Sequence, residues 1–153
     1  MKTQSPFANI ILIVMVTSLA LAGEVEKGVP ADPQNTKAVG GSYYCGDGKG
    51  YNVTLKLEES GSYSAEWRGC LGKYGEASGI WKLSGKQIVL TSKKETEMMQ
   101  GHLKTLDILK YKDDWIFVRS DGRDFYDKYG VSRYSCFQKV ETKTPQKRQP
   151  RGR

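Results

Sequence analysis

The sequence contains one histidine, and this scarcity restricts the catalytic chemistry open to the protein. A triad needs a nucleophile paired with a histidine base, and the sequence offers His102 no such companion. Acid–base pairs could be drawn from Asp121, Asp124 and Asp127, but aspartates beside glycines are what turns ordinarily contain. We therefore expect a protein that is not an enzyme and carries no cofactor.

Long apolar runs are also scarce, because only one occurs in the chain. Residues 10–22, IILIVMVTSLALA, follow the positive charge of Lys2 and end in Ala-Leu-Ala, which fits the small-residue rule for signal-peptide cleavage. The run is shorter than the roughly 18 to 20 apolar residues that span a bilayer, and no cysteine follows it to accept a lipid anchor. We expect residues 1–22 to be a secretory signal peptide that exports a protein without a membrane span to the periplasm or the extracellular space.

Positive charge is in excess at one end of the chain only. Residues 23–138 carry 17 Lys and Arg against 16 Asp and Glu, whereas residues 139–153 carry six against one. The final segment has no apolar residue after Val140, so it buries too little surface to offset its ordering entropy. We expect a flexible linker at 23–40, one folded domain at 41–140 and a disordered basic tail at 141–153. An exported tail of this kind suits anionic envelope surfaces rather than nucleic acid.

Helical periodicity is missing from the expected domain, and short alternating stretches take its place. Tyr51, Val53, Leu55 and Leu57 alternate with polar residues, as in a half-buried strand with one wet face. Turn signals such as ESGS and SGK separate such stretches at a spacing typical of all-β sandwiches and barrels. We predict eight strands, at residues 42–45, 51–58, 63–67, 77–83, 87–92, 102–111, 115–120 and 133–140.

Eight consecutive strands can remove their exposed edges by closing on themselves. The sequence therefore predicts an all-β fold, a single small antiparallel up-and-down barrel, which we expect to be a monomer. A barrel of this size leaves room inside for side chains or for one small molecule. The bulk of the inward candidates favours an interior filled by side chains, those of Tyr51, Tyr63, Trp67, Trp81, Trp115 and Phe117.

The segment GSYYCGDGKGYNVTLKLEESGSYSAEWRG, followed by GIWKLSGKQIVLTS, resembles the strand pattern of small exported bacterial β-barrels of lipocalin-like type. These include the N-terminal domain of the copper-stress lipoprotein family. The paired-cysteine motif of that family is absent, because Gly46 follows Cys45, so its metal function does not carry over. A second resemblance, to small disulfide-bonded barrels that inhibit lysozyme in bacterial periplasms, implies an inhibitor of a hydrolase.

Alternate connections of a meander fall at opposite ends of the barrel. The short connections share one end, and the long ones, at 46–50, 68–75, 93–101 and 121–133, share the other. The last of these, DGRDFYDKYGVSR, predicts a short helical turn that stops at Gly130. Function concentrates on loops that a rigid scaffold carries, so we expect this long-loop rim to bind a ligand or a partner. The candidate residues are Leu71, Tyr74, Met98, Met99, Arg123, Tyr126, Tyr129 and Arg133.

The three cysteines all fall toward the same rim. In an oxidising compartment they predict one disulfide and one free thiol, and we favour Cys70 with Cys136, a bridge that would tie a glycine-rich loop to the closing strand. Cys45 with Cys70 is the close alternative, and Cys45 with Cys136 would be a cross-strand pair at the seam. A zinc site of Cys45, Cys70, Cys136 and His102 is a remote alternative, because the spacing matches no known zinc motif.

These observations together predict an exported, non-enzymatic barrel that binds a ligand or protein partner through its long-loop rim. Two alternatives stay open. One is an inhibitor of a hydrolase, with protruding loops and a filled barrel. The other is a lipocalin-like carrier, with a cavity for a small apolar ligand inside the barrel.

Overall fold

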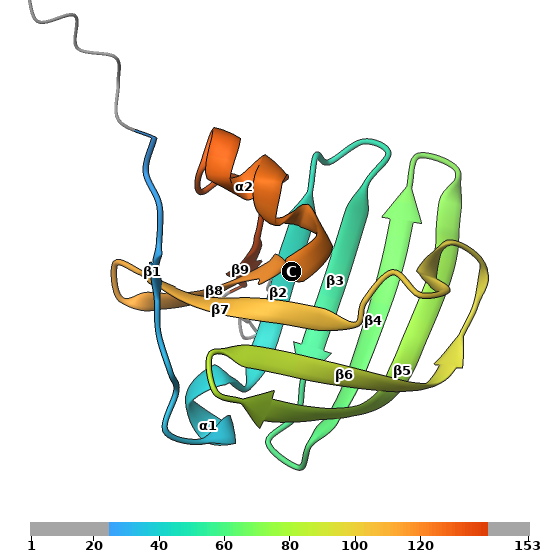
Figure 1. Ribbon diagram of the computed structural model, residues 1–153. Helices are drawn as coiled ribbons and strands as arrows, with labels where there is room; N and C mark the ends of the chain where they lie inside the picture. The colour runs from blue at the N-terminus through green and yellow to red at the C-terminus, as the bar shows by residue number, and fades with distance from the viewer. Residues whose placement is uncertain (1–24, 141–153) are drawn as a thin grey trace, which may run out of the picture.

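A closed antiparallel β-barrel forms the body of the protein in its computed structural model, which describes residues 25–140 (Figure 1). The expected signal peptide and basic tail lie outside the described residues. Eight strands follow one another around the barrel, and the predicted all-β fold is confirmed. They are β2 (Gly41–Gly46), β3 (Asn52–Leu57), β4 (Ser62–Gly69), β5 (Gly72–Ser84), β6 (Gln87–Glu95), β7 (Thr105–Tyr111), β8 (Asp114–Arg119) and β9 (Phe137–Lys139).

The barrel closes where the last strand meets the first. In the short strand β9, Gln138 pairs with Tyr44 of β2 on one side and with Ile116 of β8 on the other. Strands β2 to β5 run upright in Figure 1, and β6 to β8 cross them. The additional strand β1 (Val29–Pro30) pairs with Leu109 and Lys110 of β7, beyond the point where β6 stops pairing with that strand.

Alternation along the strands builds the core inside the barrel. The six bulky residues expected to point inward all belong to it or pack against it: Tyr63, Trp81 and Phe117 are at most 3% exposed, and Tyr51, Trp67 and Trp115 lie partly buried at its margins. The prediction of an interior filled by side chains is therefore confirmed for these positions.

A second apolar cluster lies outside the barrel wall. It consists of Leu109, Ile116, Val118, Tyr126 and Cys136. Helix α2 (Arg123–Tyr129) contributes to this cluster and ends at Gly130, as the sequence predicts, with a backbone φ of 67°. The second cluster places α2 against the outer face of β7 and β8.

The segment expected as a flexible linker takes part in the fold. After β1 the chain forms the single turn α1 (Thr36–Val39), in which Asn35 accepts a hydrogen bond from the backbone of Ala38, and Val39 is fully buried. Backbone hydrogen bonds to β7 and the buried side chain of Val39 hold the segment in place. Its low apolar content gave no sign of this, because backbone bonds do not depend on apolar side chains.

The glycine-rich stretch at 68–75 is a tight hairpin, so our expectation of a long loop there was wrong. Strands β4 and β5 continue to Gly69 and Gly72, and only Cys70 and Leu71 form the turn. A side chain at Gly75 would bring a Cβ within 2.5 Å of the Thr96 carbonyl oxygen. Because Gly75 has no side chain, the loop that follows β6 can pack closely against it. This loop contains the 3₁₀ turn η1 (Glu97–Met99).

Candidate functional site

A pocket of about 230 Å³ opens at the long-loop end, between the barrel mouth and α2. Arg119, at the end of β8, is the one charged residue among those that line it. Aromatic rings and small groups form the rest of the wall, so the pocket combines a single cation with an apolar surface. The lining residues are Cys45, Tyr51, Arg119, Gly122, Phe125, Tyr134, Ser135, Cys136 and Phe137.

Two long connections, before β3 and after β6, meet the β4–β5 turn and the end of β8 beside this pocket through polar contacts. The hydroxyl of Tyr51 lies 3.1 Å from Nε2 of His102, and a terminal nitrogen of Arg119 lies 3.0 Å from the same ring atom. The Sγ of Cys70 donates to the Lys49 carbonyl oxygen at 3.2 Å, which joins the β4–β5 turn to the loop before β3. These contacts confirm that the long connections gather at one end.

Aromatic packing fixes the polar groups at the mouth. The rings of Tyr51 and His102 both contact Trp67, with centroid separations of 4.9 and 4.8 Å, and the indole nitrogen of Trp67 donates to the Gly50 carbonyl oxygen. Burial and the neighbouring Arg119 guanidinium lower the pKa of His102 to about 4. The imidazole is therefore neutral near pH 7 and lies beside the guanidinium without lining the pocket itself.

An ion pair on the solvent side orients the guanidinium. Nε of Arg119 donates to Asp121 at 2.9 Å, and a terminal nitrogen donates to the second carboxylate oxygen at 2.5 Å. The side chain of Arg119 is 26% exposed, whereas that of Asp121 is 65% exposed and is not part of the pocket wall. Arg119 is thus held from outside and still lines the pocket.

Two exposed aromatic residues flank the pocket entrance. Phe125 on α2 is 47% exposed, and Tyr134, in the segment before β9, is 58% exposed. Phe137 lies deeper and is almost fully buried. Exposed rings at the entrance and one cation in a largely apolar wall form the arrangement expected for a small ligand with an apolar body and a polar end.

The two thiols of the pocket are protonated at neutral pH. Burial raises the pKa of Cys45 to about 12, and the nearby Cys136 adds to the rise. Burial also raises the pKa of Cys136, whose Sγ donates to the Ser132 carbonyl oxygen at 3.3 Å. Since the thiolate is the nucleophilic form, neither group is equipped to attack a substrate.

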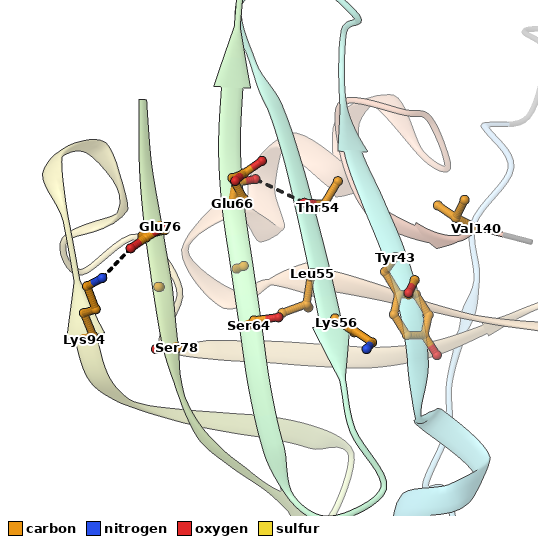
Figure 2. A pocket seen from close by; sticks show the side chains of 13 residues that line it. Tyr43, Thr54, Leu55, Lys56, Ser64, Glu66, Glu76, Ser78, Lys94 and Val140 are labelled. Carbon is orange, nitrogen blue, oxygen red and sulfur yellow. Dashed lines mark hydrogen bonds and ion pairs between the residues drawn. The ribbon is translucent and has the colours of Figure 1, made fainter. Parts of the chain in front are cut away.

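A second hollow, wider and more open, lies on the outer face of β2 to β5 (Figure 2). Its volume is about 580 Å³, and small side chains such as Thr54, Ser64 and Ser78 line much of it. Its charges are engaged in ion pairs, as with Lys94, which lies 2.5 Å from Glu76 (Figure 2). This shallow surface offers a ligand less than the pocket beside Arg119.

The expected rim residues have separate surroundings. Leu71 at the β4–β5 turn is 91% exposed and Met98 is 56% exposed, whereas Met99 is fully buried in the barrel core. Tyr74 folds back over its own hairpin, close to Gly69. None of the eight predicted residues is among those that line the pocket described above.

The predicted residues on and after α2 also differ from one another. Arg123 bonds Asp127 on its own helix, and Tyr126 is fully buried in the second cluster. Tyr129 is half exposed, with its ring 4.5 Å from that of Phe125, and Arg133 is exposed. Tyr126 therefore faces the protein interior, and a direct role for it in partner contact is not supported.

The expected disulfide between Cys70 and Cys136 is absent from residues 25–140, in which the three cysteines are free. Cys70 is exposed at the β4–β5 turn, Cys45 belongs to the barrel core and Cys136 to the second cluster. The alternation of apolar and polar residues along the sequence did not reveal that Cys70 and Cys136 are apart. It indicates which face of a strand a residue occupies, and not how far that residue lies from one on another strand. No group of three potential metal ligands gathers within the same residues, and the three cysteines do not assemble around His102.

Sequence reasoning missed Arg119, although a signal for it exists. Trp115 and Phe117 alternate along β8 and both pack in the core, so the same parity places Arg119 on the inner face at the barrel mouth. Arg119 falls within the strand that we predict at 115–120, and we assign it no role there. An inward-facing arginine at a barrel mouth is the pattern that would have identified the pocket.

No protein-family model, curated protein or solved structure matches the chain. Among residues 25–140, no helix has the length and apolar character needed to cross a membrane. The barrel fold is that of a small antiparallel barrel, consistent with the lipocalin-like type.

Proposed function

We propose that this protein is an exported binding protein that holds a small organic ligand in the pocket beside Arg119. The observation that carries the proposal is the composition of this pocket. One guanidinium, which Asp121 and His102 hold in place, lies beneath two exposed rings, Phe125 and Tyr134. Pockets for small molecules combine a largely apolar wall with a few placed polar groups in this way.

The rim is a better location for a ligand than the barrel interior. Large side chains pack inside the barrel, where the rings of Tyr43 on β2 and Phe117 on β8 have centroids 4.4 Å apart and Trp81 on β5 is 2% exposed. A lipocalin-like carrier would need that space for its ligand. The filled core therefore favours a shallow site at the mouth.

Binding suits this site better than catalysis. The two thiols have raised pKa values, and the neutral His102 has its ring nitrogens next to Arg119 and Tyr51. A general base needs a free nitrogen and a pKa near the working pH, and the adjacent guanidinium opposes protonation of the ring. The groups at the mouth are thus equipped to position a ligand.

The test is a titration with phenylacetamide, a neutral aromatic probe, followed by proton–nitrogen correlation spectra. We expect the shifted amide signals to cluster at the residues that line the pocket. Phe125→Ala should weaken binding about fivefold or more through loss of one aromatic wall. Met98→Ala, which removes an exposed rim side chain outside the pocket, should leave binding unchanged. Shifted amide signals scattered over the barrel, or an equal loss of binding affinity in both variants, would contradict the proposal.

A second candidate function rests on the tip of the β4–β5 hairpin. Leu71 is 91% exposed at a two-residue turn, a geometry suited to insertion into a cleft of a partner protein. The partner that the sequence suggests is a hydrolase of the lysozyme type. Inhibition of lysozyme by the protein, abolished by Leu71→Asp and retained in Phe125→Ala, would favour this candidate over ligand binding.

We also propose export, and a closer relation of the barrel to the lipocalin-like type, on the sequence features that suggested them. The supporting features are the apolar run at 10–22 and the strand pattern that begins at Gly41. Mass spectrometry of the protein recovered from its native host should find a chain that begins at Gly23. A chain that retains residues 1–22 would overturn cleavage at this point.

A further inference from the structure

We infer that the ligand of the pocket beside Arg119 is a small aromatic carboxylate, whose carboxylate binds Arg119 in competition with Asp121. This inference rests on the proposed function and adds the chemical class of the ligand. It depends on three features of the site, namely the unused donors of Arg119, the exposure of Asp121 and the charge of the pocket wall.

The guanidinium has donors to spare. An arginine carries five N–H donors, and the bonds to Asp121 and His102 occupy three of those on Arg119. A hydrogen bond with the Tyr51 hydroxyl occupies a fourth. One N–H group is therefore left on a side chain that lines the pocket, and the two that Asp121 engages become available when a ligand displaces it. A carboxylate matches this planar fork better than a hydroxyl or an amide does, because it can accept two charge-assisted hydrogen bonds.

The existing partner of Arg119 can be replaced at little cost. Asp121 is 65% exposed, so its carboxylate is well solvated when it leaves the guanidinium. Exposed ion pairs of this kind contribute little to stability, because water and salt screen them. A ligand carboxylate that approaches from the more enclosed pocket side is screened less and can take over part of the interaction.

The charge of the wall favours a monoanion. Within residues 25–140, Arg119 is the only charged residue that lines the pocket, and the nearby Arg123 is engaged by Asp107 and Asp127. A phosphate dianion would require a second available cation. One carboxylate on a neutral body balances the charge that the pocket presents.

The size and the walls define the ligand body. A volume of about 230 Å³ is below the range usual for drug-sized ligands, which indicates a single ring with a short arm. Phe125 and Tyr134 at the entrance and Phe137 deeper in the pocket supply aromatic contact along this length. An aromatic ring between these residues can place its carboxylate at Arg119.

The experiment compares phenylacetate with phenylacetamide, two probes of nearly the same shape that differ in charge. Calorimetric titration of the full chain should show that phenylacetate binds about tenfold more tightly. Asp121→Asn should strengthen phenylacetate binding about threefold and leave phenylacetamide unchanged, because it removes a competing carboxylate. Arg119→Met should reduce phenylacetate to the affinity of the amide.

Two controls keep the outcome interpretable. Arg133→Gln removes an exposed arginine that does not line the pocket, and it should not alter either affinity. A melting curve establishes whether Arg119→Met is folded. If it is not, Asp121→Asn decides the question, because it should strengthen the binding of phenylacetate and leave that of phenylacetamide unchanged.

The possible results separate the two proposals. Equal affinity for both probes, with shifts confined to the pocket, overturns the carboxylate inference and leaves the proposed function standing. Failure of both probes to bind overturns both proposals. A phenylacetate preference that Arg133→Gln abolishes also overturns the inference, since the anion would then be bound at the surface.

Discussion

The hydroxyl of Tyr126 accepts a hydrogen bond from the backbone N–H of Gly28 at 2.6 Å, across 98 residues of sequence. This bond joins α2 to the segment that precedes the barrel. The Val131 N–H donates to the Glu26 carbonyl oxygen at 2.8 Å, and the pairing of β1 with β7 continues the same attachment. Residues 25–31 and α2 therefore stabilise each other over the second cluster, next to the proposed pocket.

Tyr126→Phe should destabilise the protein by about 1 kcal/mol, because the Gly28 N–H loses its partner at a partly buried position. Urea unfolding measures the free energy, and hydrogen exchange should show the greatest loss of protection at Gly28. Tyr129→Phe is the matched control on the same helix, since Tyr129 is half exposed, and it should change stability little. Equal effects of the two changes would show that the bond from Gly28 contributes nothing measurable.

Gly130→Ala should destabilise the protein strongly, because Gly130 combines a positive φ with a close approach of the chain. An added Cβ would lie 2.3 Å from the Glu26 carbonyl oxygen. Gly85→Ala provides the control: its φ is also positive, at 56°, but no heavy atom lies within 4 Å of the added Cβ. Both changes incur the backbone cost of about 1 kcal/mol, and Gly130→Ala should cost about 2 kcal/mol more.

The comparison is made by urea unfolding of both variants under identical conditions. Similar decreases in the free energy of unfolding for Gly130→Ala and Gly85→Ala would mean that Val25 and Glu26 move away from the new methyl group at no energetic cost. The attachment of residues 25–31 would then be weaker than the structure indicates.

The barrel could be predicted from the sequence because alternation and turn signals are local. Every one of the eight predicted strands has a counterpart in β2 to β9, and the helical turn that ends at Gly130 is also present. The hairpin at Cys70 and Leu71 was missed because its glycines look like a loop. A register shift between Trp67 and Arg68 allows the strands to continue through them.

The candidate site was less accessible to sequence reasoning, because it depends on contacts between distant segments. Tyr51 and His102 come from two separate connections and Arg119 from the end of β8, and the three meet only when the barrel closes. Exposed aromatics such as Tyr129 attract attention in a sequence, whereas the pocket depends on one arginine at the end of a core strand. Pairing of the cysteines was beyond reach for the same reason, since their clusters are defined by tertiary packing.

Thiol labelling provides a direct test of the free cysteines. An alkylating reagent at about pH 8 should modify one thiol rapidly in the native protein, that of the exposed Cys70, and all three after denaturation without reductant. Cys45 and Cys136 should react slowly, because they are buried and burial raises their pKa values. Peptide mapping assigns the labels, and Cys70→Ser is the control that should remove the rapid reaction. Only one labelled thiol after denaturation would establish a disulfide and contradict the structure.

The stability of the protein should depend on pH through His102. Its pKa is about 4 in the folded protein, against 6.5 for an ordinary histidine, first because of burial and then because of the Arg119 guanidinium. Between these values the unfolded chain binds a proton that the folded protein does not bind. The free energy of unfolding should therefore fall as the pH decreases from 6.5 to 4, and this contribution should level off below the lower value.

The expected loss is about 1 to 2 kcal/mol, less than the full shift would give, because the ring is partly exposed and solvent screens its charge. Urea unfolding at several pH values in this window measures it. His102→Gln should flatten the dependence, since glutamine keeps a polar group near Tyr51 and Arg119 but does not titrate. Carboxylates such as Asp121 titrate at lower pH, because the bond from Arg119 lowers the pKa of Asp121 below its usual value. An unchanged slope in His102→Gln would place the pH dependence elsewhere and show that the folded protein accommodates a charged imidazole beside Arg119.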